Sequence, residues 1–122
     1  MRSLIESLTA EHREVEAALE RFEERAASST LDSSALQELH KRLAGHYDRE
    51  EPIFARLAGQ GFPVAEKFRG QHAEALEIAA HLDDALAGQT ADVSYLARRL
   101  LAIAKHNMIE EERDLFPLVP GG

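Results

Sequence analysis

Apolar residues recur at alternating steps of three and four through four long stretches of the chain, and no stretch alternates as a strand does. Each such stretch, folded as a helix, carries one apolar stripe along its length. The fourth stripe is the least regular. The stripes are Ile5, Leu8, His12, Val15, Leu19 and Phe22; Leu36, Leu39, Leu43, His46, Glu50, Ile53 and Leu57; Ala65, Phe68, His72, Ala75, Ala79, Leu82 and Leu86; and Leu96, Leu100, Ile103, His106 and Glu110.

Short polar segments rich in Ser, Asp, Gly and Pro separate the four stretches, at residues 28–34, 59–63 and 88–90. Short links between helices of similar length force neighbouring helices to run antiparallel. A chain of 122 residues encloses one core. We therefore expect an all-α protein in which residues 1–122 form a single up-down-up-down antiparallel four-helix bundle.

Local signals place the helix ends and one irregularity. Ser33 or Ser34 can cap the second helix, and Thr90 or Asp92 the fourth. Pro52 lies inside the second stretch, where it removes a helical hydrogen bond. We expect a kink just after Glu50 and irregular backbone on that helix.

Each stripe contains one histidine: His12, His46, His72 and His106. A bundle core rarely holds four imidazoles unless they bind a metal. His46 and His106 each have a glutamate four residues later, Glu50 and Glu110, on the same side of the helix. An antiparallel bundle would bring these two pairs to one level, and the sequence therefore predicts a buried metal site. The other two histidines, His40 and His81, lie off the stripes and are expected at the surface or its boundary.

The chemistry of the expected ligands favours iron. The chain has no cysteine, so nitrogen and oxygen must hold the metal. A carboxylate can bridge two cations, so four imidazoles with Glu50 and Glu110 would serve two metals. An oxo or hydroxo bridge would reduce the positive charge that remains, which favours a redox-active di-iron centre over two structural zinc ions. No histidine has a glutamate three residues before it, which excludes the ligand pattern of ferritin-like di-iron bundles.

Composition excludes several classes of partner. The net charge is −8 and basic residues cluster at most in pairs, such as Arg98 with Arg99, so nucleic acid is not expected to bind. The longest apolar run, Leu100 to Ala104, is far too short for a membrane span, and Met1 to Glu14 lacks the apolar region of a signal peptide. We expect a cytoplasmic protein without membrane contact. No nucleophile, general base or substrate motif stands out, which disfavours an enzyme acting on an organic substrate.

With these residues the chain resembles the hemerythrin-like, or HHE cation-binding, family. The resemblance rests on His12, His46-x3-Glu50, His72, His106-x3-Glu110 and the closing Leu115-Phe116-Pro117. It implies a four-helix bundle around an oxo-bridged di-iron site, with the four histidines as terminal ligands and with Glu50 and a C-terminal acid as bridges. Members of the family bind dioxygen reversibly, sense oxygen, iron or nitric oxide, or handle peroxide.

The sequence departs from the oxygen-carrying members at two positions. Those members have a second histidine four residues after the third-helix histidine, where this chain has Leu76. That side of the site would keep an open position or water, or would use Glu77 or His81. The last acid of the carriers follows its histidine by five residues, so Glu111 is an alternative to Glu110, which a straight helix favours.

Two functions follow from this sequence. The first is a non-haem di-iron protein that senses, stores or handles oxygen, peroxide, nitric oxide or iron, with peroxide turnover as a side activity. Its partner would be dioxygen or another small diatomic or peroxide ligand. The alternative is a helical scaffold or partner-binding module with a mononuclear zinc site or no metal.

Overall fold

A computed structural model describes residues 2–28, 30–88 and 92–119 as four long helices with a short irregular extension. The helices are α1 (Arg2–Ala27), α2 (Ser33–Gly59), α3 (Val64–Gly88) and α4 (Val93–Glu110). A π-helix, η1 (Glu111–Leu115), and a single 3₁₀ turn, η2 (Phe116–Leu118), continue α4. The described residues contain no strand, which confirms the all-α fold.

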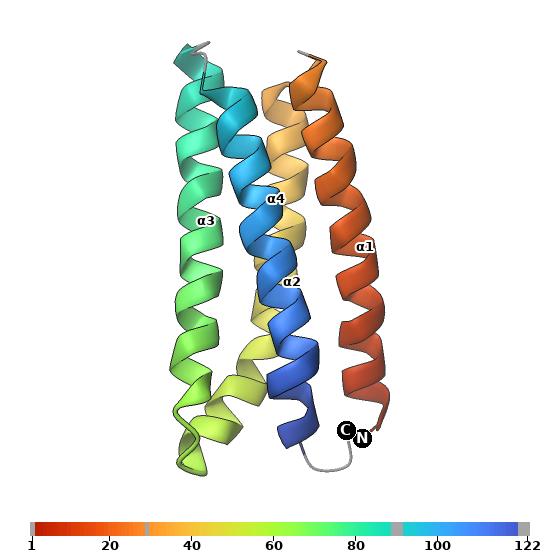
Figure 1. Ribbon diagram of the computed structural model, residues 1–122, viewed down its shortest axis with the longest axis vertical. Coiled ribbons are helices and arrows are strands. Elements are labelled where there is room, and N and C mark those ends of the chain that lie inside the picture. Colours follow the sequence, from red (N-terminus) through yellow and green to blue (C-terminus); the bar gives the residue numbers. More distant parts are fainter. Residues whose placement is uncertain (1, 29, 89–91, 120–122) are drawn as a thin grey trace.

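The helices run alternately up and down and close into a ring (Figure 1). Each packs against two neighbours: α1 against α2 and α4, and α3 against α2 and α4. This is the up-down-up-down bundle that the short links predict. Within the described ranges no helix combines the length and apolar character needed to cross a bilayer.

The helix starts differ in detail from the sequence prediction. Asp32, rather than Ser33 or Ser34, caps α2, and its carboxylate accepts a 2.8 Å hydrogen bond from the Ala35 amide. Asp92 occupies the cap position of α4 without a side-chain hydrogen bond. Thr90, the other predicted cap, lies outside the described residues.

A layer of buried polar side chains divides the apolar core into two clusters. This polar layer contains His12, His46, Glu50, His72 and Glu111. On each helix the layer residue separates side chains of the two clusters, as His12 separates Leu8 from Val15 on α1. The larger core cluster lies toward the α1–α2 link and contains Val15, Leu19, Phe22, Leu43, Tyr47, Ala75, Leu82, Leu100 and Met108 among others. The smaller core cluster contains Ile5, Leu8, Ile53, Phe54, Leu57, Ala65, Phe68, Leu115 and Phe116. The side chains of the site meet between these two clusters.

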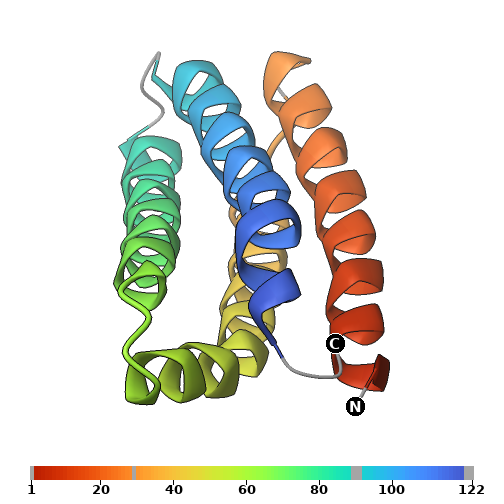
Figure 2. The ribbon, with the colours of Figure 1, turned by 60° about the horizontal axis from the view of Figure 1, so that its bottom comes forward.

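Two helices are irregular close to that layer. α2 continues through Pro52 as one helix, but its last turns lean away from the first part and cross the end of the bundle (Figure 2). The predicted bend is present. The break in regular hydrogen bonding, however, lies on the fourth helix, where the Phe116 amide donates to the Glu111 carbonyl five residues back. This π-turn adds one residue to the helical turn beside the site.

Candidate metal centre

Four buried side chains from three elements meet in the polar layer. They are His12 on α1, His46 and Glu50 on α2, and Glu111 at the start of η1. All four are at most 1% exposed. One nitrogen or oxygen atom of each lies within 4.8 Å of the corresponding atoms of the other three. This spacing suits ligands that converge on a cation.

The carboxylates of Glu50 and Glu111 occupy the centre of the cluster. Glu50 Oε1 lies 2.8 Å from His46 Nε2, 3.6 Å from His72 Nε2 and 4.0 Å from His12 Nε2. Glu111 reaches His12 Nε2 with Oε1 at 3.1 Å and His72 Nε2 with Oε2 at 2.6 Å. Glu111 therefore extends between two imidazole groups, with His12 and His46 on one side and His72 on the other.

Several atoms of the cluster lack hydrogen-bond partners although they are buried. They are Nε2 of His12 and His46, both oxygens of Glu50, and Oε1 of Glu111. His12 Nε2 and His46 Nε2 lie close to carboxylate oxygens, but without the alignment of a hydrogen bond. Each buried polar atom left unpaired costs about 1–3 kcal/mol. A bound cation would satisfy these nitrogen and oxygen atoms together, so the residues fit a metal.

Two outer carboxylates orient the imidazoles. Glu112 Oε2 lies 2.7 Å from His12 Nδ1, and Glu11 Oε1 lies 2.7 Å from His46 Nδ1. A carboxylate on Nδ1 leaves Nε2 as the atom that faces the cluster, an arrangement common behind metal-binding histidines.

Comparison with protein families agrees with this geometry. The model of the hemerythrin HHE cation-binding domain matches residues 3–119. The chain belongs to this family. Comparison with curated proteins and with solved structures found no match.

Arginines hold the outer carboxylates of the HHE domain in place. Arg13 Nη2 lies 2.5 Å from Glu112, and Arg49 Nε lies 2.8 Å from Glu11. Sequence reasoning missed Glu11 and Glu112. Glu11 precedes His12 in the chain but binds His46 on the neighbouring helix, and helical periodicity carries no signal for such a cross-helix pair.

Electrostatics couples the imidazoles to the carboxylates. Burial lowers the pKa of His12, but the adjacent carboxylates of Glu111, Glu50 and Glu112 outweigh burial and raise this pKa to about 10. Burial likewise opposes the charge on Glu111, yet the adjacent imidazoles of His12 and His72 hold the pKa of Glu111 well below its usual value. A proton on His12 thus balances negative charge of the buried carboxylates in the metal-free protein.

The structure brings together four of the side chains that the sequence singled out: His12, His46, Glu50 and His72. At the remaining position it uses Glu111, the alternative to Glu110. Glu110 instead binds Lys67 at 2.5 Å, Gln71 at 3.1 Å and His106. Glu111 lies one regular helical turn after the buried Asn107, as Glu110 does after the exposed His106, which explains why an argument that started from His106 favoured Glu110.

The expectation that His106 faces the core is wrong. Its side chain is 69% exposed and contacts Glu110. Asn107 and Met108 take the inward positions on α4, because each step along a helix turns the side chain by about 100°. The irregular stripe of the fourth stretch left this rotation open.

Asn107 is a buried polar residue of the site that sequence reasoning missed. It is 1% exposed, and its amide donates to Gln71 Oε1 at 2.7 Å and to Glu111 Oε2 at 3.0 Å. It therefore fixes the orientation of the Glu111 carboxylate.

Oxygen-carrying members of the family have a second histidine beside the one that corresponds to His72. In the described part of this chain, no further imidazole or carboxylate takes its place. Leu76 is half-buried and packs against the larger core cluster. Glu77 and His81, the suggested replacements, are exposed and line a surface pocket. His40 is exposed, as expected.

Tyr47 forms part of the wall beside His72. Its ring stacks on the His72 imidazole, with centroids 3.7 Å apart and planes 10° from parallel. Burial, together with the charges of Glu111 and Glu50, raises the pKa of this phenol, which is therefore neutral.

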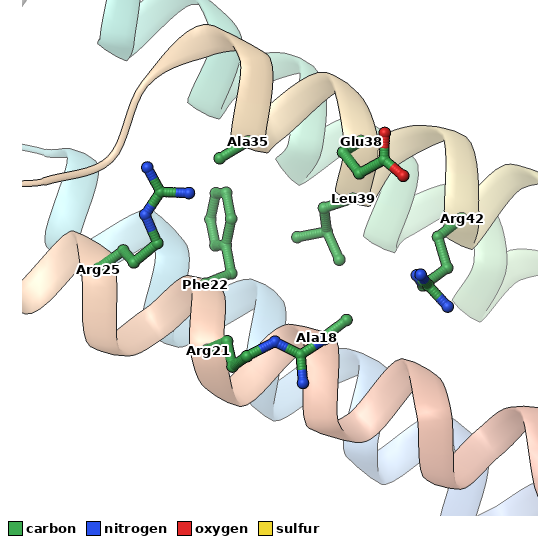
Figure 3. A pocket seen from close by; sticks show the side chains of 8 residues that line it. All are labelled: Ala18, Arg21, Phe22, Arg25, Ala35, Glu38, Leu39 and Arg42. Carbon is green, nitrogen blue, oxygen red and sulfur yellow. The ribbon is translucent and has the colours of Figure 1, made fainter.

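A surface pocket between α1 and α2 is lined by different kinds of side chain from those of the buried cluster (Figure 3). It has a volume of about 260 Å³, and Phe22 and Leu39 lie between the side chains of Arg21, Arg25 and Arg42. It has no imidazole and is lined by a single carboxylate, so it is not a cation site.

Proposed function

We propose that this HHE domain holds two non-haem iron ions, joined by an oxo or hydroxo bridge, between its four helices. The observation that carries the proposal is the position of Glu111, whose two oxygens reach His12 on one side and His72 on the other. A carboxylate that serves two groups of nitrogen ligands suits a bridge between two cations. Glu50, close to all three imidazoles, would be the second bridge.

The chain's own residues would set the properties of the centre. His12 and His46 would hold one iron, and His72 the other. The two core clusters lie on either side of the layer and would keep bulk water from it, and Glu11 and Glu112 contact the Nδ1 atoms of His46 and His12 and would keep these imidazoles oriented. When bound, iron supplies a redox couple and a place for a small ligand.

The proposed function is sensing, storage or handling of dioxygen, peroxide, nitric oxide or iron. Because Leu76 supplies no nitrogen, the His72 side would have an open position. We expect the di-ferrous protein to be oxidised by dioxygen or peroxide rather than to carry dioxygen reversibly. The family resemblance also predicts His106 as a ligand, but that role would require α4 to turn, because the His106 side chain is exposed; we expect two irons to bind without it.

A second candidate is a mononuclear site. His12, His46, Glu50 and Glu111 alone form a compact set of four ligands, the number that a structural zinc ion takes. In that case the domain would be a metal-stabilised helical scaffold or partner-binding module.

Metal analysis with absorption spectroscopy separates the two candidates. After expression with sufficient iron, we expect close to two irons per chain and the near-ultraviolet absorption of an oxo-bridged ferric pair. One metal per chain, or zinc without such absorption, would reject the binuclear centre and favour the scaffold.

A further inference from the structure

Tyr47 lies at the boundary between the polar layer and the larger core cluster. It follows His46 on α2, it is 6% exposed, and its ring packs face to face on His72. His72 is the imidazole without a second nitrogen ligand beside it, because Leu76 takes that position. Tyr47 therefore borders the side of the cluster that has only one imidazole.

The Tyr47 hydroxyl is buried and has no hydrogen-bond partner among the described residues. A buried tyrosine normally finds one, because an unpaired hydroxyl is costly. The other buried side-chain atoms without partners all belong to the same layer, on His12, His46, Glu50, Asn107 and Glu111. The unsatisfied groups thus gather in one place, as expected where a bound species completes the site.

A metal ion cannot satisfy the Tyr47 hydroxyl in the way it satisfies the other atoms. Imidazole nitrogen and carboxylate oxygen offer lone pairs to a cation, whereas a neutral phenol has a proton to donate. What this hydroxyl lacks is an acceptor. The acceptor must enter the site together with the metals.

We propose that the Tyr47 hydroxyl donates a hydrogen bond to the small external ligand that binds on the His72 side of the metal centre. The inference rests on the proposed function. Tyr47 would select ligands that carry negative charge or strong lone pairs, such as azide or peroxide, because hydrogen bonds to charged acceptors are the stronger ones. It acts as a specificity-determining residue and binds no metal.

Azide binding to the iron-loaded ferric protein tests this proposal. Tyr47→Phe removes only the hydroxyl and keeps the ring that stacks on His72. We expect it to weaken azide binding about tenfold or more, the loss typical of a hydrogen bond to a charged group. Tyr95→Phe is the matched control, because Tyr95 is the only other tyrosine and is 54% exposed. It should leave the azide affinity unchanged.

The melting temperature of the metal-free protein supplies a second readout. If the hydroxyl has no partner in that form, metal-free Tyr47→Phe should melt at or above the wild-type temperature. A clearly lower melting temperature would show that the hydroxyl has an internal partner, and would overturn the proposal.

The iron content of each sample distinguishes the possible failures. Equal azide affinity of Tyr47→Phe and wild type, with two irons in both, overturns the role of Tyr47 but leaves the proposed function intact. Absence of iron from the wild type overturns both. A visible phenolate-to-iron band that Tyr47→Phe abolishes would show that Tyr47 is itself a metal ligand, and would also overturn the proposal.

Discussion

At the scale of single residues, the site depends on which nitrogen of each imidazole faces inward. Glu11 and Glu112 settle this for His46 and His12 by binding Nδ1, and arginines hold both carboxylates. The ligand atoms are therefore oriented before a metal arrives. Pre-oriented ligands lose less conformational freedom when they bind.

Glu11→Gln tests this orientation. The amide keeps the shape of the side chain but removes the charge that makes the His46 imidazole a better ligand. We expect the metal dissociation constant to rise about 10- to 100-fold, as is typical for outer-shell substitutions. Competition with a chelator measures it. Glu24→Gln, an exposed position on the same helix, is the control. Equal affinity in both variants would show that Glu11 has no such role.

Protonation of His12 makes the stability of the metal-free protein depend on pH. Its pKa rises from 6.5 to about 10 on folding, so the folded state binds this proton more tightly than the unfolded state does. The resulting stabilisation is complete below the unfolded pKa of 6.5 and is lost as pH rises through about 10. We expect the melting temperature of the metal-free protein to fall across this range. His12→Gln should flatten the dependence, and a flat wild-type profile would contradict the prediction.

At the scale of elements, the rotation of α4 decides which acid enters the site. Because Asn107 faces inward, Glu111, one α-helical turn later, enters the layer, and Glu110 lies beside Lys67. The π-turn of η1 follows Glu111. Two adjacent residues of the same type thus have different environments, because each step along a helix turns the side chain by about 100°.

Substitution of the two glutamates separates their roles. We expect Glu111→Gln to lose most of the bound iron, because an amide cannot bridge two cations as a carboxylate does. Glu110→Gln, its matched control, should keep close to two irons per chain. His106→Ala should also keep them. Iron analysis of the three purified variants gives the answer, and loss of iron from His106→Ala would show that α4 turns to bring His106 inward.

The sequence was sufficient for the helices and for the level of the site, but not for the rotation of the last helix. Periodicity alone places His12, His46, Glu50 and His72 on inward faces, because their stripes are regular. The choice of Asn107 over His106 depends on packing against other helices. The π-turn depends on main-chain hydrogen bonds that residue spacing does not encode.

At the scale of the whole molecule, the polar layer joins residues from α1, α2, α3 and the end of α4 at one level. The metal-free bundle therefore contains a layer of unsatisfied atoms between two apolar clusters. A cation that binds the folded cluster and not the unfolded chain must stabilise the whole bundle.

Thermal unfolding measures this linkage. At a free metal concentration of about 100 times Kd, binding adds about 2.7 kcal/mol, which raises the melting temperature of a domain of this size by roughly 10 °C. His46→Ala should lose most of the increment. His40→Ala, on the exposed face of α2, should keep it. Identical melting of the metal-free and loaded wild-type protein would mean that this cluster does not bind metal in the folded state.

The division of the core also governs how the bundle opens. In the metal-free protein the two apolar clusters are separate, so amide protons at one end can exchange with solvent while the other end stays closed. A metal centre would tie the helices together between the two ends. Exchange at either end would then require the same event, the loss of a ligand from the centre.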